Sequence, residues 1–466
     1  MSKVVVHAAY RLSEKAPEDF DALFLGFIDQ VGRDLLVGTF SDFHQSIFPS
    51  EKAFSAFKDR AAAAAACHDD RKDEEVEKGL YGFRLDLDVS LFADPAYGLQ
   101  RLVHMLVSDV YMRRFSKVVG GVIVRSIDFG DLRNDIEKVY RTRSHDRHAI
   151  RAAFKLPADR PLLAFSLKPR SCLSDEDYYA MVRSAFDGGC EIVELDTRDL
   201  QLSGDPRIGL LESLSQLAID MSKGRVCRFS ANLSGPQRVI RPIYERLAKV
   251  HEAAAADGPW VVKVDGNLDG LSTVQAIRAD EFEAYRQPII TCYPVLKYAL
   301  ANALGPNGFV QMLAMSGVDI IYPGQSPAFG TANGRIDTNQ VAAARKHYIE
   351  MDMGGYPMLS VAGGVAINSV HACMSVLGGD IAFFIGGGIA TSKRGIRSGA
   401  QNFAQAIELS RVDLFEKGEI RNLERKMVDL SKIYFDDGEI PADYEFIEPR
   451  TLKAIGDRFR STNLGD

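Results

Sequence analysis

A lysine and two carboxylates stand at the ends of two short apolar runs, where they could carry out chemistry together. Lys168 follows the run Leu162–Leu167, and Pro169 directly after it disfavours an immediate helix. Glu194 and Asp196 end a second run with a spacing of two, so both side chains point the same way from a strand. Such residues could transfer protons or hold a cation. The simpler alternative is a lysine that opens a helix-capping loop.

Lys168 is the candidate proton-transferring group. Burial beside apolar strands would lower its pKa, whereas nearby acids would raise it. The balance decides whether the side chain acts as a general base or as a general acid. Arg170 is a second catalytic candidate at the same strand end. A Schiff-base role for Lys168 stays open, although nothing in the sequence singles it out.

Eight short apolar runs separated by helical patterns predict the elements that position these residues. Eight strands, each followed by a helix over ~250 residues, indicate a (β/α)8 TIM barrel. A doubly wound open sheet is the alternative, but a nucleotide-binding sheet would carry a phosphate loop after its first strand, and Lys-Pro-Arg is not one. The predicted strands are Leu162–Leu167, Glu191–Leu195, Val226–Ala231, Trp260–Val264, Pro288–Cys292, Val318–Tyr322, Pro357–Val361 and Ile381–Ile385.

Glycines follow the seventh and eighth predicted strands, as Gly363-Gly364 and Gly386–Gly388. Backbone N–H groups at such turns can approach an anion closely, and these two strand ends form the common phosphate site of barrels. Ordinary turns also need glycine, so each run alone is weak evidence. On the fourth strand we interpret Lys263 as half of an ion pair in the barrel mouth, with Glu194 or Asp196 as possible partners.

The predicted domains are an N-terminal α+β domain (1–135), a linker (136–160), the barrel (161–432) and a C-terminal tail (433–466). Strand, helix and strand patterns in the first domain favour a small ferredoxin-like sheet with helices on one face. The alanine-rich, charged segment Arg60–Lys78 is interpreted as a surface helix and loop. His145 and His148 have metal-like spacing, but we interpret them as linker side chains among arginines.

Composition limits the class of protein. The chain has 466 residues and a net charge of -7, which argues against nucleic-acid binding. The six cysteines are scattered without a Cys-x-x-Cys, so we expect neither disulfides nor a structural zinc site. We therefore expect the protein to lie in a reducing cytoplasm. We expect no signal peptide, and no apolar run approaches the ~18 residues of a membrane span.

Several segments together are similar to one known family. Residues 160–174 resemble R-P-L-L-G-x-x-x-K-P-K-x-G-L-S, and residues 188–196 resemble G-G-x-D-x-x-K-x-D. Gly38-Thr39 resembles a G-T-W phosphate contact, and residues 129–133 resemble L-x-D-L-R. These are motifs of the ribulose-bisphosphate carboxylase (RuBisCO) large subunit, and the chain resembles more closely its non-carboxylating relatives, the RuBisCO-like proteins. The resemblance implies an α+β N-domain followed by a (β/α)8 barrel.

The departures from the family pattern exclude ribulose-bisphosphate carboxylation. Glu194 stands where the family has a carbamylated, metal-binding lysine. The remaining replacements are Thr197 for a carboxylate, Tyr293-Pro294 for a histidine–arginine pair, Tyr322 for a histidine, Phe329 for a loop lysine and Ala362 for a serine. The family's first phosphate region, with residues like Gly38-Thr39 and the two glycine turns, is kept apart from the loop lysine. The second phosphate region has lost its arginine, its histidine and its serine. The resemblance therefore implies a substrate with one phosphate.

The resemblance implies a homodimer that acts on a singly phosphorylated sugar or sugar acid by enolisation, as an isomerase, tautomerase or decarboxylase. Lys168 would move the proton, with Tyr293 or Tyr322 as a second acid–base or orienting group, unless these rings only fill space. Glu194 and Asp196 are candidate Mg2+ ligands, and a metal-free mouth is the alternative. The expected phosphate-binding residues are Thr39, Gly363, Gly364, Gly386 and Gly387, with Thr39, Asp34 and Asp109 expected to reach the partner's barrel. The rival hypothesis is a non-catalytic sugar-phosphate-binding or regulatory protein.

Overall fold

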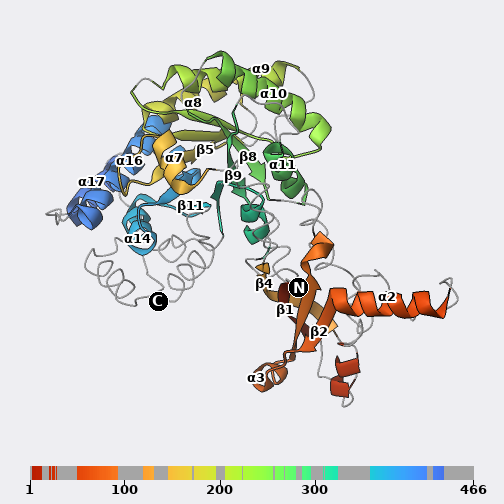
Figure 1. Ribbon diagram of the computed structural model, residues 1–466. Coiled ribbons are helices and arrows are strands. Elements are labelled where there is room, and N and C mark those ends of the chain that lie inside the picture. Colours follow the sequence, from red (N-terminus) through yellow and green to blue (C-terminus); the bar gives the residue numbers. More distant parts are fainter. Residues whose placement is uncertain are drawn as a thin grey trace. The chain divides into compact units, whose positions relative to one another are not determined.

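The structure, a computed structural model, describes residues 3–12, 20–22, 24–26, 28, 50–92, 119–130, 145–169, 173–195, 205–222, 224–254, 258–266, 268–279, 286–294, 308, 310–323, 357–416 and 423–434. The chain divides into two compact units (Figure 1). The first comprises residues 1–142, 266–275 and 295–316. The second comprises residues 143–265, 276–294 and 317–466 and contains the barrel strands.

The first unit contains a four-stranded antiparallel sheet in the order β2-β3-β1-β4. Its strands are β1 (Lys3–Leu12), β2 (Ala65–Asp69), β3 (Leu80–Asp88) and β4 (Val119–Asp128), with α2 (Glu51–Ala64), α3 (Asp73–Val76) and the short 3-10 helix η2 (Val89–Phe92). Alternate residues of β1, among them Val4, Val6 and Tyr10, are buried. The order is that of a ferredoxin-like βαββαβ sheet, which confirms the predicted α+β domain.

Strand β2 corrects the interpretation of Arg60–Lys78 as helix and loop only. Alanines have high helix propensity, and the run of them does form the end of α2. The chain then changes at Ala65 and pairs antiparallel with β3 from Ala65 to Asp69. Helix propensity predicts the structure of this segment poorly, because pairing with β3, a strand later in the chain, decides that the segment forms a strand.

The second unit contains a closed barrel of eight parallel strands in the order β10-β11-β12-β5-β6-β7-β8-β9. All eight predicted strands are confirmed. They are β5 (Leu162–Ser166), β6 (Ile192–Leu195), β7 (Arg228–Asn232), β8 (Val261–Asp265), β9 (Ile289–Tyr293), β10 (Ile320–Ile321), β11 (Met358–Ala362) and β12 (Ile381–Ile385). Alternate residues such as Leu162, Ala164, Ile192 and Ile289 share one buried apolar cluster.

Helices follow the strands as the period of the sequence predicts. They are α7 (Arg147–Ala153), α8 (Asp175–Asp187), α9 (Asp205–Asp220), α10 (Gln237–Ala253), α11 (Leu268–Arg278), α14 (Ile367–Leu377), α15 (Gly387–Ala390), α16 (Gly395–Phe415) and α17 (Leu423–Tyr434). The helical pattern of the sequence predicts a helix from Pro242, and α10 begins five residues earlier, with Pro242 inside it. The sequence pattern also predicts a helix at Val295–Leu304 and a strand at Leu35–Phe40, and both segments lie outside the described residues.

Helix α7 lies in the segment predicted as a linker. Asp146 caps it, because its Oδ1 accepts a hydrogen bond from the Ala149 N–H at 2.6 Å. Ile150 in α7 and Phe154 after it join the buried cluster of barrel residues. The sequence did not predict this helix, because the segment is mostly polar and contributes only Ile150 and Phe154 to the buried cluster.

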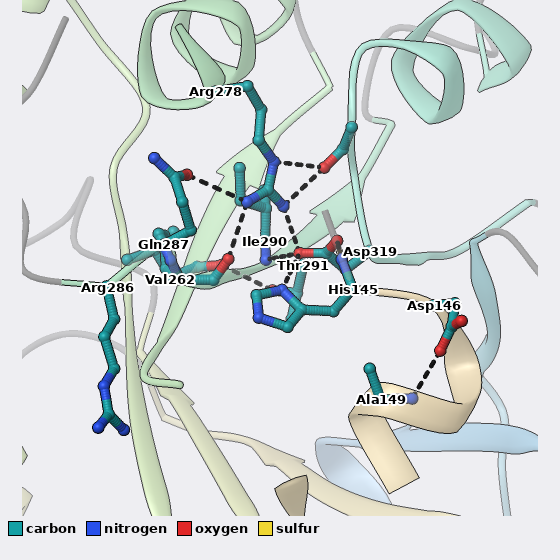
Figure 2. A network of polar contacts seen from close by, with 12 residues as sticks. His145, Asp146, Ala149, Val262, Arg278, Arg286, Gln287, Ile290, Thr291 and Asp319 are labelled. Carbon is teal, nitrogen blue, oxygen red and sulfur yellow. Dashed lines mark hydrogen bonds and ion pairs between the residues drawn. The ribbon is translucent and has the colours of Figure 1, made fainter. Parts of the chain in front are cut away.

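A buried arginine–carboxylate network joins the chain at the N-terminal ends of β9 and β10 (Figure 2). Arg278 and Asp319 have fully buried side chains and form an ion pair. The Arg278 guanidinium also donates to the carbonyls of Gly317 and Pro288 at 2.7 and 3.0 Å. The Asp319 carboxylate accepts the backbone N–H groups of Ile290 at 2.7 Å and His145 at 2.6 Å. This end of a barrel serves stability, whereas active sites lie at the opposite end.

We expect Arg278→Met to lower the free energy of unfolding by about 3–5 kcal/mol, because it leaves the Asp319 carboxylate buried without its charged partner. Arg241→Met is the matched control. It breaks the exposed Arg241–Glu245 pair, whose nitrogen and oxygen are 2.7 Å apart, and should cost less than about 1 kcal/mol. Urea unfolding of both variants measures the difference. Equal losses would contradict a structural role for the network.

A buried histidine predicts acid sensitivity. Burial and the charge of Arg228 lower the pKa of His251 to about 3, whereas an unfolded histidine has a pKa near ~6.5. The unfolded chain therefore binds this proton first as the pH falls, so the stability from neutral His251 is full above pH ~6.5 and declines below it. We expect the wild type to lose about 2 kcal/mol more than His251→Asn between pH 7 and pH 5. Parallel pH dependences of unfolding would contradict this.

Candidate active site

Four polar side chains form a layer inside the barrel, here called the polar layer: Ser166, Glu194, Lys263 and Thr291. Strand register pairs Ser166 with Glu194 and Lys263 with Thr291. The Lys263 Nζ donates to Glu194 Oε1 at 2.8 Å. The hydroxyls of Ser166 and Thr291 donate to the two Glu194 oxygens at 3.4 and 3.3 Å. Strands β6 and β8 are next-but-one neighbours, and alternate strands contribute to one layer of a barrel interior.

Asp265 ends β8 at the C-terminal side of the polar layer. Its carboxylate is buried and has Oδ1 4.0 Å from the Lys263 Nζ. Its backbone N–H donates to the Ser234 Oγ at 2.6 Å. Burial, followed by the nearby Asp265 charge, raises the pKa of the Cys292 thiol far above its usual value. Cys292 is therefore a neutral thiol.

Glu194 does not fit the role of magnesium ligand that the sequence suggested. A magnesium ion binds carboxylate oxygen at about 2.0–2.1 Å in octahedral geometry. The Lys263 ammonium already lies 2.8 Å from Oε1, and hydroxyl donors face both oxygens. Among the described residues no three His, Cys, Asp or Glu side chains gather as a metal cluster. Asp196, the other predicted ligand, lies outside the described residues.

Lys168 lies at the C-terminal end of β5, half-buried, beside the glycine turn after β12. A methyl group added at Gly386 would lie 3.3 Å from Lys168 Cγ, 3.5 Å from its Cε and 3.1 Å from the Ser166 carbonyl oxygen. The lysine stem therefore passes directly over Gly386. The Lys168–Pro169 peptide bond is cis. A larger residue at position 386 would therefore press on the Ser166 carbonyl oxygen and on the Lys168 stem.

The two glycine turns pack against each other. Gly363 and Gly364 are exposed and have positive φ angles of 75° and 65°, a conformation that favours glycine. A methyl group at Gly388 would lie 2.8 Å from the Val365 carbonyl oxygen, so the second turn lies against the first. Gly387 and Gly388 are the first two residues of α15. The first N–H of this helix that donates to a backbone carbonyl of the turn is that of Ile389, which donates to the Gly386 carbonyl. The N–H groups of Gly387 and Gly388 thus belong to the helix positions that lack an intrahelical acceptor.

The two candidate tyrosines stack on one another at the ends of β9 and β10. The ring centroids of Tyr293 and Tyr322 are 4.8 Å apart and the rings are within 5° of parallel. The Tyr322 N–H donates to the Cys292 carbonyl at 3.1 Å, which aligns the two residues. Tyr322 is 2% exposed and Tyr293 is 37% exposed, so only Tyr293 offers a surface to solvent.

The structure therefore brings Lys168 to Gly386 and Tyr293 to Tyr322, while Glu194 meets Lys263. Thr39, Arg170 and Asp196 lie outside the described residues. Sequence reasoning missed Ser166 and Thr291. Each stands two residues before a candidate that was identified, Lys168 or Tyr293, so the strand period could have placed them on the same inward face.

No family model matches the chain. Ribulose bisphosphate carboxylase of Methanosarcina acetivorans is 25% identical over 274 residues, which cover 54% of this chain and 61% of that protein. The protein of the same name from Methanocaldococcus jannaschii is 23% identical over 316 residues, or 62% of this chain and 70% of the relative. The chain thus matches about three-fifths of the length of the Methanosarcina relative.

Solved structures share the fold. Octameric RuBisCO of Pyrococcus horikoshii matches with a TM-score of 0.67 and 16% identity, over 94% of this chain and 95% of that one. A RuBisCO-like protein, MtnW, of Alicyclobacillus acidocaldarius matches with a TM-score of 0.64 and 16% identity, over 92% and 99%. In the part of the chain that the structure describes, no helix is both long and apolar enough to cross a membrane. The chain is thus similar in sequence to archaeal ribulose bisphosphate carboxylases over part of its length, and it shares the fold of RuBisCO and of a RuBisCO-like protein.

A double-mutant cycle tests the polar layer. Lys263→Met should lower the free energy of unfolding by about 3–5 kcal/mol, because Glu194 is left buried and charged. Adding Glu194→Gln removes that charge, so the double variant should lose far less than the sum of the single variants. Urea unfolding of all four proteins measures the coupling. Additive losses would show that the two side chains do not interact.

Proposed function

We propose that the chain is a RuBisCO-like enzyme that acts on a singly phosphorylated sugar or sugar acid by enolisation-type proton transfer. The proposed enzyme is an isomerase, a tautomerase or a decarboxylase, and not a bisphosphate carboxylase. The contact of the Lys168 stem with Gly386 carries the proposal. It supports the proposal because the side chain proposed to transfer the proton lies beside the turn proposed to hold the substrate phosphate.

In the proposed step the amine of Lys168 takes a proton from a carbon next to a carbonyl group. The carbon–hydrogen bond breaks, a nitrogen–hydrogen bond forms, and the electron pair moves to the carbonyl oxygen as an enolate. Return of the proton to the former carbonyl carbon, with transfer of the neighbouring hydroxyl proton to the enolate oxygen, gives isomerisation, and its return to the enolate oxygen gives tautomerisation. In decarboxylation the carbon–carboxylate bond breaks instead and CO2 leaves, so its electron pair forms the enolate. The Lys168 ammonium then donates a proton to that carbon and regains one from water.

The two sides of the barrel mouth support a substrate with one phosphate. On the side of β11 and β12, Gly363, Gly364, Gly386 and Gly387 present backbone close to solvent, as anion sites require. On the side of β9 and β10 lie the stacked rings of Tyr293 and Tyr322, two positions at which the family pattern has histidines. A neutral aromatic surface offers nothing to neutralise a second phosphate.

The partners follow from the same proposal. We expect a homodimer or larger homo-oligomer with a shared active site, in which Thr39 of one chain completes the phosphate site of the other. Solved proteins of the same fold support this, since one is described as octameric and another, from Hyperthermus butylicus, as dimeric.

Lys168→Met should slow proton exchange strongly while leaving phosphate-ester binding intact. Candidate ketose phosphates and sugar-acid phosphates are incubated in D2O with either protein, and deuterium incorporation is followed by NMR. Loss of the general acid–base group should slow exchange by about 10²–10⁴-fold. Calorimetric titration of the same ligands provides the binding measurement.

Gly386→Ala extends the test without removing the lysine. Its methyl group would press on the Lys168 stem, so exchange should slow although the amine is present. Gly209→Ala is the control, because a methyl group there meets no atom within 4 Å. Binding without exchange by the wild type would favour the rival, a non-catalytic sugar-phosphate-binding protein. Neither binding nor exchange with any phosphorylated ligand would overturn the proposal.

A further inference from the structure

The Lys263 ammonium is the cation of the polar layer. It lies 2.8 Å from Glu194 and 4.0 Å from Asp265, and its side chain is 12% exposed. We propose that Lys263 takes the place of a divalent cation and stabilises the enolate oxygen during a metal-independent reaction. The catalytic part of this inference rests on the proposed function; the replacement of the cation does not.

The charges around Glu194 support the replacement. Among the described residues, two buried carboxylates, Glu194 and Asp265, flank the Lys263 ammonium, and the hydroxyl donors Ser166 and Thr291 are neutral. A dication beside Glu194 would have to displace the ammonium or lie against it in a region of low dielectric, where like charges repel strongly. The ammonium satisfies Glu194 instead, and a buried carboxylate must be paired in this way to remain charged.

The placement of Lys263 suits an enolate. Ser166 belongs to the polar layer, and Lys168 lies two residues further along the same strand, one step nearer the barrel mouth. A substrate anchored by its phosphate at the glycine turns would therefore rest above the polar layer. Its reacting carbon would face Lys168, and its carbonyl oxygen would point down to the Lys263 ammonium. Preorganised positive charge at a developing oxyanion is a large source of catalysis.

The reaction balances without a metal. One proton leaves the carbon for the Lys168 amine, and the carbonyl oxygen gains the electron pair. An N–H of Lys263 donates a hydrogen bond to that oxygen and is not itself transferred. The Lys168 ammonium exchanges protons with solvent and then returns a proton to the substrate, so both lysines end the cycle as they began it.

The first measurement needs no substrate. The full chain is stripped with EDTA and titrated with Mg2+ and with Mn2+ by calorimetry, and its melting temperature is followed in parallel. We expect no saturable binding by the wild type and no change in melting temperature. Saturable binding at millimolar or lower concentration would overturn the inference, even if the proposed function fails.

The second measurement separates a catalytic from a structural role of Lys263. The single variant Glu194→Gln keeps the Lys263 ammonium, and the double variant Glu194→Gln with Lys263→Met lacks it. Both variants lack the Glu194 carboxylate, so neither leaves it buried without a charged partner. We expect the double variant to have a kcat for exchange about 10²–10³-fold below that of Glu194→Gln, with little change in KM. Wild-type exchange should be equal in EDTA and in Mg2+. Equal kcat values for the two variants, or loss of exchange in EDTA, would overturn the catalytic role.

Discussion

The ion pair between Lys263 and Glu194 is the interaction on which the proposed chemistry of this barrel depends. It spans the lumen from β8 to β6, past β7, and draws the hydroxyls of Ser166 and Thr291 into one layer. A carboxylate buried in a lumen must be neutralised, by a metal or by a cation of the protein. In this chain the cation is the ammonium group of Lys263. The polar layer below the site is therefore complete once the barrel strands have paired.

The two ends of the barrel use buried charge differently. At the N-terminal ends of the strands, Arg278 and Asp319 are enclosed by backbone donors and acceptors, and the side chains of this pair have no exposure. At the C-terminal ends, Lys263 retains some exposure and Lys168 is half-buried. The first arrangement holds strands together, whereas the second leaves charged groups within reach of a ligand. This division agrees with where barrel enzymes place stability and chemistry.

Much of the fold could be predicted from the chain alone, since all eight barrel strands coincide with apolar runs and their inward residues follow a period of two. The same period indicated that Glu194 and Lys263 could meet. It could not decide between a lysine partner and a metal, because that choice depends on distances across the lumen. Strand β2 and helix α7 were missed, since an alanine run and an arginine-rich segment gain their structure from β3 and from the barrel core. The stacking of Tyr293 on Tyr322 was equally invisible, because it follows from the stagger of β9 and β10.

The central claim is that a lysine occupies the place of a metal ion beneath the substrate. A crystal structure with a bound sugar phosphate, grown in Mn2+ and measured for anomalous scattering, tests it most directly. We predict the Lys263 Nζ within hydrogen-bonding distance of both Glu194 and a ligand oxygen, with no anomalous peak in the lumen. A manganese peak on Glu194, with the Lys263 side chain turned away, would contradict the claim.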